Sequence, residues 1–327
     1  MEEDLRQPTS IEFCAGAGGQ ALGLEQAGFN HLLLVDNDAD CCATLSENRP
    51  DWRVETADMA TYQLPKLDEV DLFAAGLPCP PFSVAGKQLG AQDERNLFPA
   101  ALRLIEESQP KFVLIENVRG FLSRSFATYR EELRLAFDRL GYGVDWKLFD
   151  AKTFGVSQTR NRVAIVAAKK PYWDAFTFPE PCHSKPQPVG DLLFDLMQEN
   201  GWRHASDWKN AAQGIAPTIV GGSKKHGGPD LGPTRAREAW AKLGVNGRSV
   251  AEAAPLTDHE GPPRLTTRMV ARVQGFPDDW VFTGKKTSAY RQVGNAFPPP
   301  VARALGLSIL SALQSVDGCT ETAVAAE

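Results

Sequence analysis

The sequence predicts an α/β protein built on a doubly wound, mostly parallel sheet, with a smaller and less regular second domain. Three observations favour this class. Up to residue 168, short apolar runs alternate with amphipathic stretches, as strands and helices do in such a sheet. The first apolar run passes directly into a glycine-rich turn. Between 170 and 263 prolines and glycines multiply, and only 234–243 keeps a helical period.

Composition limits the class of protein. The 327 residues exceed one typical core, and 43% hydrophobic with 23% charged residues is ordinary for a soluble globular chain. No apolar run is long enough to span a membrane, and the first residues are acidic where a secretory signal would be basic. The six cysteines are scattered and form no C-x-x-C pair, which argues against a structural zinc site and a disulfide framework and favours a reducing cytosol.

The net charge of −6 is unevenly distributed. Residues 181–292 hold 15 Lys and Arg against 11 Asp and Glu, a net of +4, while the remainder holds 20 against 30, a net of −10. A basic segment in an acidic body suits local contact with phosphates. On charge alone, an uneven but merely solvated surface remains the alternative.

The first elements can be placed in order. Strands are predicted over 10–15 and 31–35, each followed by a helix, over 20–27 and 39–48. A short third strand then precedes residue 57.

A glycine-rich turn, Gly16-Ala17-Gly18-Gly19, joins the first strand to its helix, where it lets a ligand approach the backbone. Asp36 ends the second strand about twenty residues later, the spacing expected for an acid that binds a ribose. Asp58 follows the third strand. Both carboxylates could instead cap the next helix.

The fourth predicted strand, 70–75, runs into Gly76-Leu77-Pro78-Cys79-Pro80-Pro81. Pro78 has no N–H to give to a sheet, so the strand must stop there. Cys79 then stands on a stiff turn at the carboxyl end of a strand, where open α/β sheets keep their ligands. It is either a positioned nucleophile or a small buried residue, since free cysteine is often buried.

A fifth strand, 111–115, ends in Glu116-Asn117-Val118. Before it come a polar stretch over 83–96, long enough to act as a lid, and a helix over 97–108. Because neighbouring strands deliver Cys79 and Glu116 to the same edge, we expect a shared site. The alternative for Glu116 is an exposed strand-end carboxylate.

Two arginines precede the last predicted strand. A helix over 129–140 leads to strands over 144–149 and 163–166. Arg160 and Arg162 alternate just before the second of these, which puts both guanidiniums on one face of an extended segment.

The irregular region carries two basic features. The stretch 216–228 is rich in glycine and contains Lys224 and Lys225, a combination that suits phosphate contact, although a flexible loop is the alternative. The helix over 234–243 opens with two further cations, Arg235 and Arg237.

Ordered structure should resume after this region. A helix is expected to follow 264–268 and run to 273, and 292–300 opens a last helix that ends near 313. The tail from 316 is small and polar, and we expect it to be frayed.

In this order the motifs resemble those of the cytosine-C5 DNA methyltransferases of prokaryotic restriction–modification systems. The matching blocks are Ala15-Gly16-Ala17-Gly18-Gly19, Asp36-Asn37-Asp38, Asp58, Gly76-Leu77-Pro78-Cys79-Pro80-Pro81-Phe82-Ser83, Glu116-Asn117-Val118, Gln158-Thr159-Arg160-Asn161-Arg162, Arg264-Leu265-Thr266-Thr267-Arg268, Gln274-Gly275-Phe276-Pro277 and Gly294-Asn295. The sequence departs from the family at Cys14, where Phe is usual, at Pro80, often Gln, and at Ser157, often Pro.

The resemblance implies a Rossmann-like catalytic domain that uses S-adenosyl-L-methionine. That domain would comprise 1–178 and 287–327, with a target-recognition domain over 179–286 inserted between its two parts. The implied substrate is double-stranded DNA, with the target cytosine flipped out of the helix. A cognate restriction endonuclease would act separately, and the enzyme is expected to be a monomer without a metal.

The resemblance also implies a role for each site residue. Cys79 would attack ring carbon 6 as a thiolate, which makes carbon 5 nucleophilic, while Glu116 stabilises charge at ring N3 and Arg160 and Arg162 orient the base. The implied cofactor-binding residues are Cys14, Gly16, Gly18, Gly19, Asp36, Asn37, Asp58, Met59 and Asn295. The implied DNA contacts are Ser83, Lys224, Lys225, Arg235 and Arg237.

Three other functions share some of these features. A transfer-RNA methyltransferase of the same family is marked by a Cys-Phe-Thr tripeptide, which this chain lacks. A dinucleotide-dependent oxidoreductase fits the glycine turn and Asp36, but gives no reason for the Cys79 and Glu116 blocks. A catalytically silent DNA-binding module would need neither block.

Overall fold

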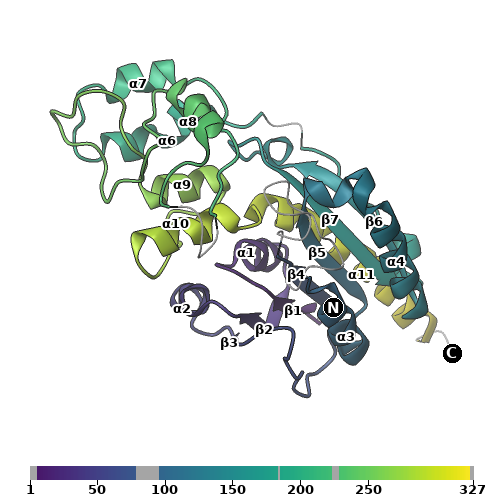
Figure 1. The fold of residues 1–327 in the computed structure, drawn as a ribbon. Coiled ribbons are helices and arrows are strands. Elements are labelled where there is room, and N and C mark those ends of the chain that lie inside the picture. The colour runs from purple at the N-terminus through teal and green to yellow at the C-terminus, as the bar shows by residue number, and fades with distance from the viewer. Residues whose placement is uncertain (1–5, 79–95, 183–184, 223–227, 325–327) are drawn as a thin grey trace.

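The computed structural model describes residues 6–78, 96–182, 185–222 and 228–324. Its centre is a seven-stranded sheet with the order β3-β2-β1-β4-β5-β7-β6 (Figure 1). Only β7 runs antiparallel to its neighbours, which confirms the prediction of a doubly wound, mostly parallel sheet. The strands are β1 Thr9–Phe13, β2 Asn30–Asp36, β3 Val54–Thr56, β4 Leu72–Gly76, β5 Phe112–Val118, β6 Tyr142–Asp150 and β7 Asn161–Lys169.

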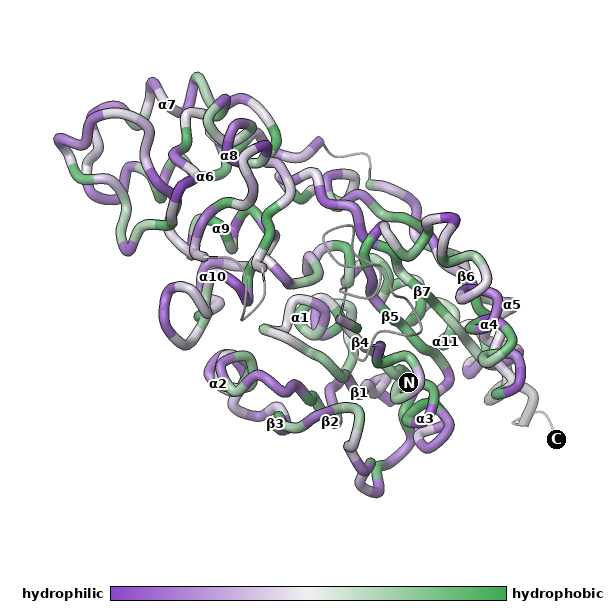
Figure 2. Tube along the Cα trace, in the orientation of Figure 1, coloured by the Kyte–Doolittle hydropathy of each residue, from purple (hydrophilic) through white to green (hydrophobic). Residues whose placement is uncertain are grey.

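Helices cover both faces of the sheet. On one face lie α1 (Gly19–Gln26), α2 (Ala39–Asn48) and α11 (Pro299–Val324), and on the other lie α3 (Phe98–Ser108) and α4 (Ala127–Arg139). The strands are apolar on both sides because each face is buried, as the hydropathy colouring of Figure 2 shows for the central strands.

The chain returns to this domain at its C-terminal end. Helix α11 packs along α1, and a Cβ at Gly23 would overlap the carbonyl oxygen of Pro299 and lie 2.5 Å from the Cβ of Ala302. We expected a frayed tail from residue 316, but α11 continues to Val324. Asp317 holds it to the sheet side, 3.0 Å from the ammonium of Lys111 and hydrogen-bonded to the hydroxyl of Tyr172.

The irregular region forms a second lobe (Figure 1). Our expectation of a single long periodic element there was wrong, because α6 (Val189–Gln198) and α7 (Ala205–Ala211) accompany α8 (Thr234–Ala241). Helices α9 (Thr267–Gln274) and α10 (Lys286–Asn295) lie between this lobe and α1. The core of the lobe is rich in tryptophan and is continuous with residues of α1; it includes Trp202, Trp208, Trp240, Ala21 and Leu22.

Short helices and connections complete the described chain: η2 Arg119–Leu122, η3 Arg124–Phe126, η4 Ala151–Phe154 and α5 Tyr172–Ala175. In the part of the chain that is described, no single helix is long and apolar enough to cross a membrane, and only the bent pair α10–α11 meets that test in combination.

Candidate active site and cofactor site

The glycine-rich turn lies at the carboxyl ends of β1 and β2. The backbone N–H of Gly16 donates to Oδ2 of Asp36 at 2.8 Å, and the N–H of Asp38 donates to Oδ1 of the same carboxylate at 2.8 Å. Gly16 and Gly18 have φ of +54° and +85°, which glycine adopts without strain. A Cβ at Gly16 would meet no heavy atom within 4 Å, so the turn is open on that side.

The other side of the turn is closed by the segment that follows the second lobe. A Cβ at Gly18 would lie 2.9 Å from the ring of Trp280, and one at Gly19 would overlap the carbonyl oxygen of Phe297. The indole N–H of Trp280 donates to the carbonyl of Ala17 at 3.1 Å. Residues that are more than 260 positions away in sequence therefore pack against this side of the turn and support it.

Cys14 and Met59 form an apolar wall beside the turn. Their sulfur atoms are 3.8 Å apart. Burial raises the pKa of the Cys14 thiol, and the carboxylates of Asp36, Asp58 and Glu12 raise it further, so this thiol stays neutral. Asp58 accepts the backbone N–H of Ala60 at 2.9 Å within a turn, and the helix that it could instead have capped is not present, since β4 is the next element of the described chain.

The side chains of Glu116 and Arg162 are in contact and buried at the adjacent strand ends. The Nε of Arg162 lies 2.6 Å from Oε1 of Glu116, and the two side chains are 14% and 6% exposed. Gly76, the last residue of β4, pairs with Glu116 on β5, and Cys79 follows three residues later. Desolvation raises the pKa of Glu116, while the charges of Arg162 and Arg160 act in the opposite direction.

Arg160 lies differently from our expectation of a base contact. Its side chain is completely buried, and its guanidinium donates to three backbone carbonyls, of Ile219 at 2.7 Å, Gly294 at 2.8 Å and Ala296 at 2.9 Å. These contacts join the start of β7 to the second lobe and to the end of α10.

Asn295 lies beside the second lobe. Its amide donates to the carbonyl of Gly222 at 3.2 Å, and the side chain is exposed. Asn37 is also exposed, between the two aspartates at the end of β2. Both residues stay predictions as cofactor contacts.

Cys79, Ser83, Lys224 and Lys225 lie outside the described residues. The arginines of α8 are described. Arg235 is exposed, whereas Arg237 is half-buried and donates to the hydroxyl of Thr234 at 3.3 Å.

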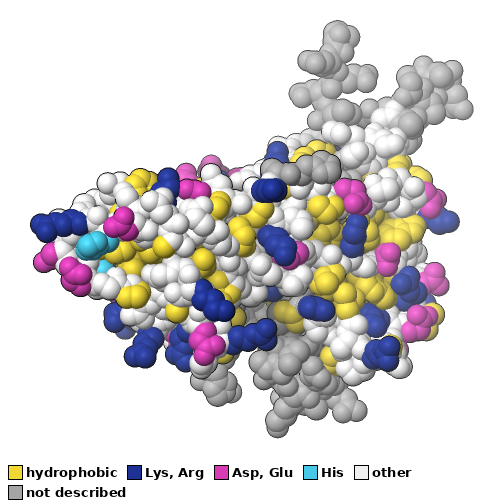
Figure 3. Space-filling view, turned by 90° about the horizontal axis from the view of Figure 1, so that it is seen from above, with side chains coloured by type: hydrophobic (Ala, Val, Ile, Leu, Met, Phe, Trp, Pro, Cys, Tyr) yellow, Lys and Arg dark blue, Asp and Glu magenta, His cyan; other side chains and the backbone are white. Residues whose placement is uncertain are grey.

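Arg237 lines an open groove of about 610 Å³ together with Asn246 and Arg248. On the face seen in Figure 3, Lys and Arg side chains are spread out with Asp and Glu among them, rather than gathered in one dense patch. A role of Arg235 or Arg237 in reading DNA therefore stays a prediction.

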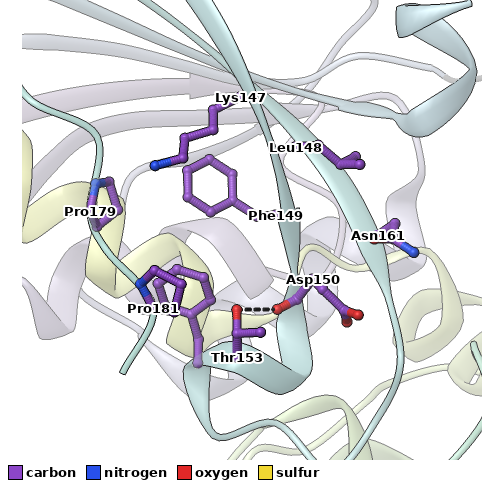
Figure 4. A pocket seen from close by; sticks show the side chains of 9 residues that line it. Lys147, Leu148, Phe149, Asp150, Thr153, Asn161, Pro179 and Pro181 are labelled. Atoms are coloured by element: carbon purple, nitrogen blue, oxygen red, sulfur yellow. Dashed lines mark hydrogen bonds between the residues drawn. The ribbon is translucent and has the colours of Figure 1, made fainter. Parts of the chain in front are cut away.

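A smaller pocket lies where the chain crosses from the sheet to the second lobe (Figure 4). It has a volume of about 280 Å³ between the end of β6, η4 and Pro179–Pro181. Asp150 lines this pocket and forms hydrogen bonds with nearby residues. Its carboxylate accepts the backbone N–H of Arg160 at 3.1 Å, and its carbonyl accepts the hydroxyl of Thr153 at 2.8 Å. None of the predicted site residues lines this pocket.

Sequence reasoning missed Gln158, Gln274 and Trp280 as contributors to the site. All three stand inside or next to quoted motif blocks, and that position is the only signal the sequence offers for them. Across the described ranges, no group of three His, Cys, Asp or Glu side chains is arranged to hold a metal ion.

Comparisons with known proteins show which family the chain resembles. The family model described as C-5 cytosine-specific DNA methylase matches residues 9–311. The chain is 51% identical to the Type II methyltransferase M.NgoMIV of Neisseria gonorrhoeae over 94% of this chain and 99% of that protein. It is 50% identical to the Type II methyltransferase M.NaeI of Lentzea aerocolonigenes, over 93% and 75%.

Solved structures share the fold. A structure described as a DNA modification methyltransferase encoded within a prophage (E. coli) superposes with a TM-score of 0.66 at 21% identity, over 94% of this chain and 99% of that one. Spodoptera frugiperda DNMT2 superposes with a TM-score of 0.62 at 15% identity, over 93% and 99%. With the family model spanning nearly all of the sheet and the second lobe, the chain belongs to the C-5 cytosine-specific DNA methylase family.

Proposed function

We propose that this methyltransferase is the modification enzyme of a type II restriction–modification system. It transfers a methyl group from S-adenosyl-L-methionine to carbon 5 of a flipped-out cytosine in a specific DNA duplex. The observation that carries the proposal is the buried Glu116–Arg162 pair, which lies beside Gly76, the residue that ends β4 three positions before Cys79. The 51% identity to a Type II methyltransferase supports the DNA substrate over transfer RNA.

The cofactor site fits its ligand in three respects. The open side of the turn at Gly16 leaves room for a ligand against the backbone. Asp36 is oriented by two backbone N–H groups, and a carboxylate retains lone pairs for the ribose hydroxyls. Cys14, which is partly exposed and packs on the buried Met59, offers apolar surface to an adenine ring. When bound, S-adenosyl-L-methionine supplies a methyl group activated by a sulfonium.

The protein's part in the reaction begins at Cys79. Its thiolate adds to carbon 6 of cytosine, and the electron pair of the ring double bond becomes available at carbon 5. Glu116 carries the proton that stabilises the charge at N3, because burial favours its neutral form. Arg162 holds that carboxyl group in place. After transfer, a base from solvent removes the proton from carbon 5, and the released electron pair re-forms the ring double bond and expels the Cys79 thiolate from carbon 6. The proton at N3 returns to Glu116.

We propose the domain division 1–178, 179–286 and 287–327, in which the recognition region interrupts one catalytic domain. The packing of α11 on α1 supports a return of the chain to that domain. The enzyme would act on duplex DNA as a monomer in the cytoplasm, with a restriction endonuclease acting separately at the same site.

The test is methylation in cells and in vitro. DNA from cells that express the chain should show 5-methylcytosine at one sequence by bisulfite sequencing, and the purified protein should transfer labelled methyl to that duplex. Labelling of transfer RNA with no labelled duplex would favour the alternative substrate. Labelling of neither nucleic acid would contradict the proposal.

A further inference from the structure

The segment 216–222, which we call the strap, leaves the second lobe and lies against the catalytic sheet. Its first half pairs with the chain just before β7. The N–H of Thr159 donates to the carbonyl of Ala216, the N–H of Ala216 donates to the carbonyl of Ser157, and the hydroxyl of Thr218 donates to the carbonyl of Thr159. The strap is therefore held in register against the residues that lead into Arg162.

Two side chains from that stretch, Gln158 and Arg160, form hydrogen bonds with the middle of the strap. Gln158 accepts the N–H of Ile219 at 2.9 Å through Oε1, and Arg160 donates to the carbonyl of the same residue at 2.7 Å. Both polar groups of one peptide residue are thus satisfied by catalytic-domain side chains. Ile219 is 1% exposed, whereas Val220, the next residue, is 45% exposed.

Arg160 contacts the end of α10 directly, and Gln158 is linked to it through Gln274. Arg160 also donates to the carbonyls of Gly294 and Ala296, and Gln158 donates to Gln274, whose amide in turn donates to Ala296 at 2.7 Å. The strap and α10 touch closely, since a Cβ at Gly294 would lie 2.5 Å from the Cα of Gly221. Arg160 is the only described side chain that donates to both.

The residues joined by Arg160 lie close in sequence to two regions with proposed functions, the base pocket and the basic stretch after the strap. Arg160 stands two residues before Arg162, which lies 2.6 Å from Glu116. The strap continues directly into the stretch that contains Lys224 and Lys225. A guanidinium fork reaches three carbonyls in fixed directions, which a lysine ammonium cannot reproduce. Burying such a charge is costly, so a completely buried Arg160 points to a requirement for rigid placement.

We propose that Arg160 is a positioning residue that couples engagement of the DNA by the strap to the placement of Arg162 and Glu116 in the base pocket. It does so through the Ile219, Gly294 and Ala296 carbonyls and makes no contact with the cytosine. The proposal rests on the proposed function and names a specific residue that transmits recognition to catalysis.

The test compares Arg160→Met and Arg160→Lys with Arg134→Met. Arg134 is a matched control, because its guanidinium also donates to a backbone carbonyl, that of Val144 at 2.9 Å, but on the opposite side of the sheet. The assay is single-turnover methyl transfer to the mapped duplex at saturating cofactor, with melting temperature and S-adenosyl-L-methionine affinity measured in parallel.

A small displacement at the reacting centre can cost on the order of 100-fold in rate, and we expect that loss for Arg160→Met with cofactor affinity preserved. Arg160→Lys should fall in between and keep the wild-type pH profile. Arg160→Met should move the alkaline limb to higher pH, since the Arg160 charge lowers the pKa of Glu116. Arg134→Met should transfer methyl at the wild-type rate.

Duplex binding separates positioning from direct contact with the base. Arg160→Met should weaken binding by about the same factor, on the order of tenfold, whether the target position carries cytosine or an abasic sugar. A loss seen only with cytosine would make Arg160 a base contact and overturn the proposal. Wild-type transfer by Arg160→Met, or an equal loss in Arg134→Met, would overturn it as well.

A milder variant covers the case in which Arg160→Met fails to fold. Thr218→Val removes only the hydrogen bond from the strap to the carbonyl of Thr159, so a stable protein with a several-fold slower transfer is expected. A stable Thr218→Val protein with the full rate would contradict the coupling. Absence of transfer by the wild-type chain would count against the proposed function instead.

Discussion

At the scale of single residues, the site depends on one carboxyl group under opposing influences. Glu116 is 5% exposed, and desolvation raises its pKa, whereas Arg162 and Arg160 lower it. The net direction is upward, so burial outweighs the arginines and the proton is retained to higher pH than in water. Cys79 has the opposite requirement, since only the thiolate attacks.

These two requirements predict a bell-shaped pH profile. The rate should rise with pH as the thiol ionises and fall as pH passes the raised pKa of Glu116. Glu116→Gln keeps the shape of the side chain but cannot donate that proton, so transfer should slow by about 100-fold or more. Single-turnover rates measured against pH provide the check. An unchanged alkaline limb in Glu116→Gln would show that another group titrates there.

The nucleophile can be tested in the same assay. Cys79→Ser should abolish transfer and leave cofactor binding nearly intact, because a hydroxyl is far less ionised than a thiol. A duplex with 5-fluorocytosine at the target should trap the wild-type protein covalently, since fluorine cannot leave as a proton does. Peptide mapping should locate the adduct on Cys79. An adduct on a different cysteine would contradict the mechanism.

At the scale of elements, the segment after α9 contacts both the glycine-rich turn of the cofactor site and helix α2, which follows Asp36. Trp280 donates to Ala17 in the glycine turn. The residues after Trp280 bind two side chains of α2, Thr44 and Asn48, which are four positions apart on one face of that helix. Asn48 exchanges two hydrogen bonds with Val281, and Thr44 accepts the N–H of Thr283. Cofactor binding should therefore depend on a segment that belongs in sequence to the far end of the chain.

Trp280→Phe tests this dependence. It keeps an aromatic ring under the turn but removes the N–H, and a lost hydrogen bond of about 0.5–1.5 kcal/mol corresponds to a twofold to tenfold weaker affinity for S-adenosyl-L-methionine by calorimetry. Trp208→Phe is the matched control, because its N–H donates to the carbonyl of Leu243 at 3.0 Å inside the second lobe. Equal weakening in both variants would remove the special role of Trp280.

The sequence predicts elements well where a local signal exists. The glycine turn, Asp36 at the end of β2 and Glu116 at the end of β5 follow from strand endings and turn residues, which depend on near neighbours. Helix α6 was missed although its apolar residues are buried at a helical spacing, because the surrounding prolines and glycines dominated the interpretation. The carbonyl partners of Arg160 lie up to 136 positions away, and no periodicity reports such pairings.

At the scale of the whole molecule, the two ends of the chain form one face of the catalytic domain. Leu24 of α1 and Ala27, which follows that helix, share a core with Leu305 and Ile309 of α11 and with the central strands. The second lobe is therefore attached at both of its ends to one folded unit.

This closure predicts that truncation before Gly294 loses cofactor binding along with DNA binding. A less disruptive variant is Gly23→Val, whose added side chain would overlap the carbonyl of Pro299. Overpacking of about 1–3 kcal/mol should lower the melting temperature by several degrees, roughly 2–4 °C per kcal/mol. Gly318→Ala is the control, since its Cβ would meet nothing within 4 Å. A truncated chain with normal cofactor affinity would contradict the closure.

The last prediction concerns how the lobe divides affinity from specificity, and salt dependence can separate the two. Lys224 and Lys225 stand among glycines, so replacing either with alanine should weaken binding to every duplex and reduce the slope of log affinity against log salt by about 0.9.

Arg235 is exposed on α8 and free to reach a guanine edge, and its loss should cost about 1–3 kcal/mol at the cognate site alone. Arg237 packs on Gly247 and binds Thr234, so its replacement should also disturb the groove around it. Binding of each variant to cognate and scrambled duplexes over a salt series distinguishes these roles. Equal losses on both duplexes for all four variants would place specificity elsewhere in the lobe, and the exposed Val220 beside the buried Ile219 would then be the next residue to replace.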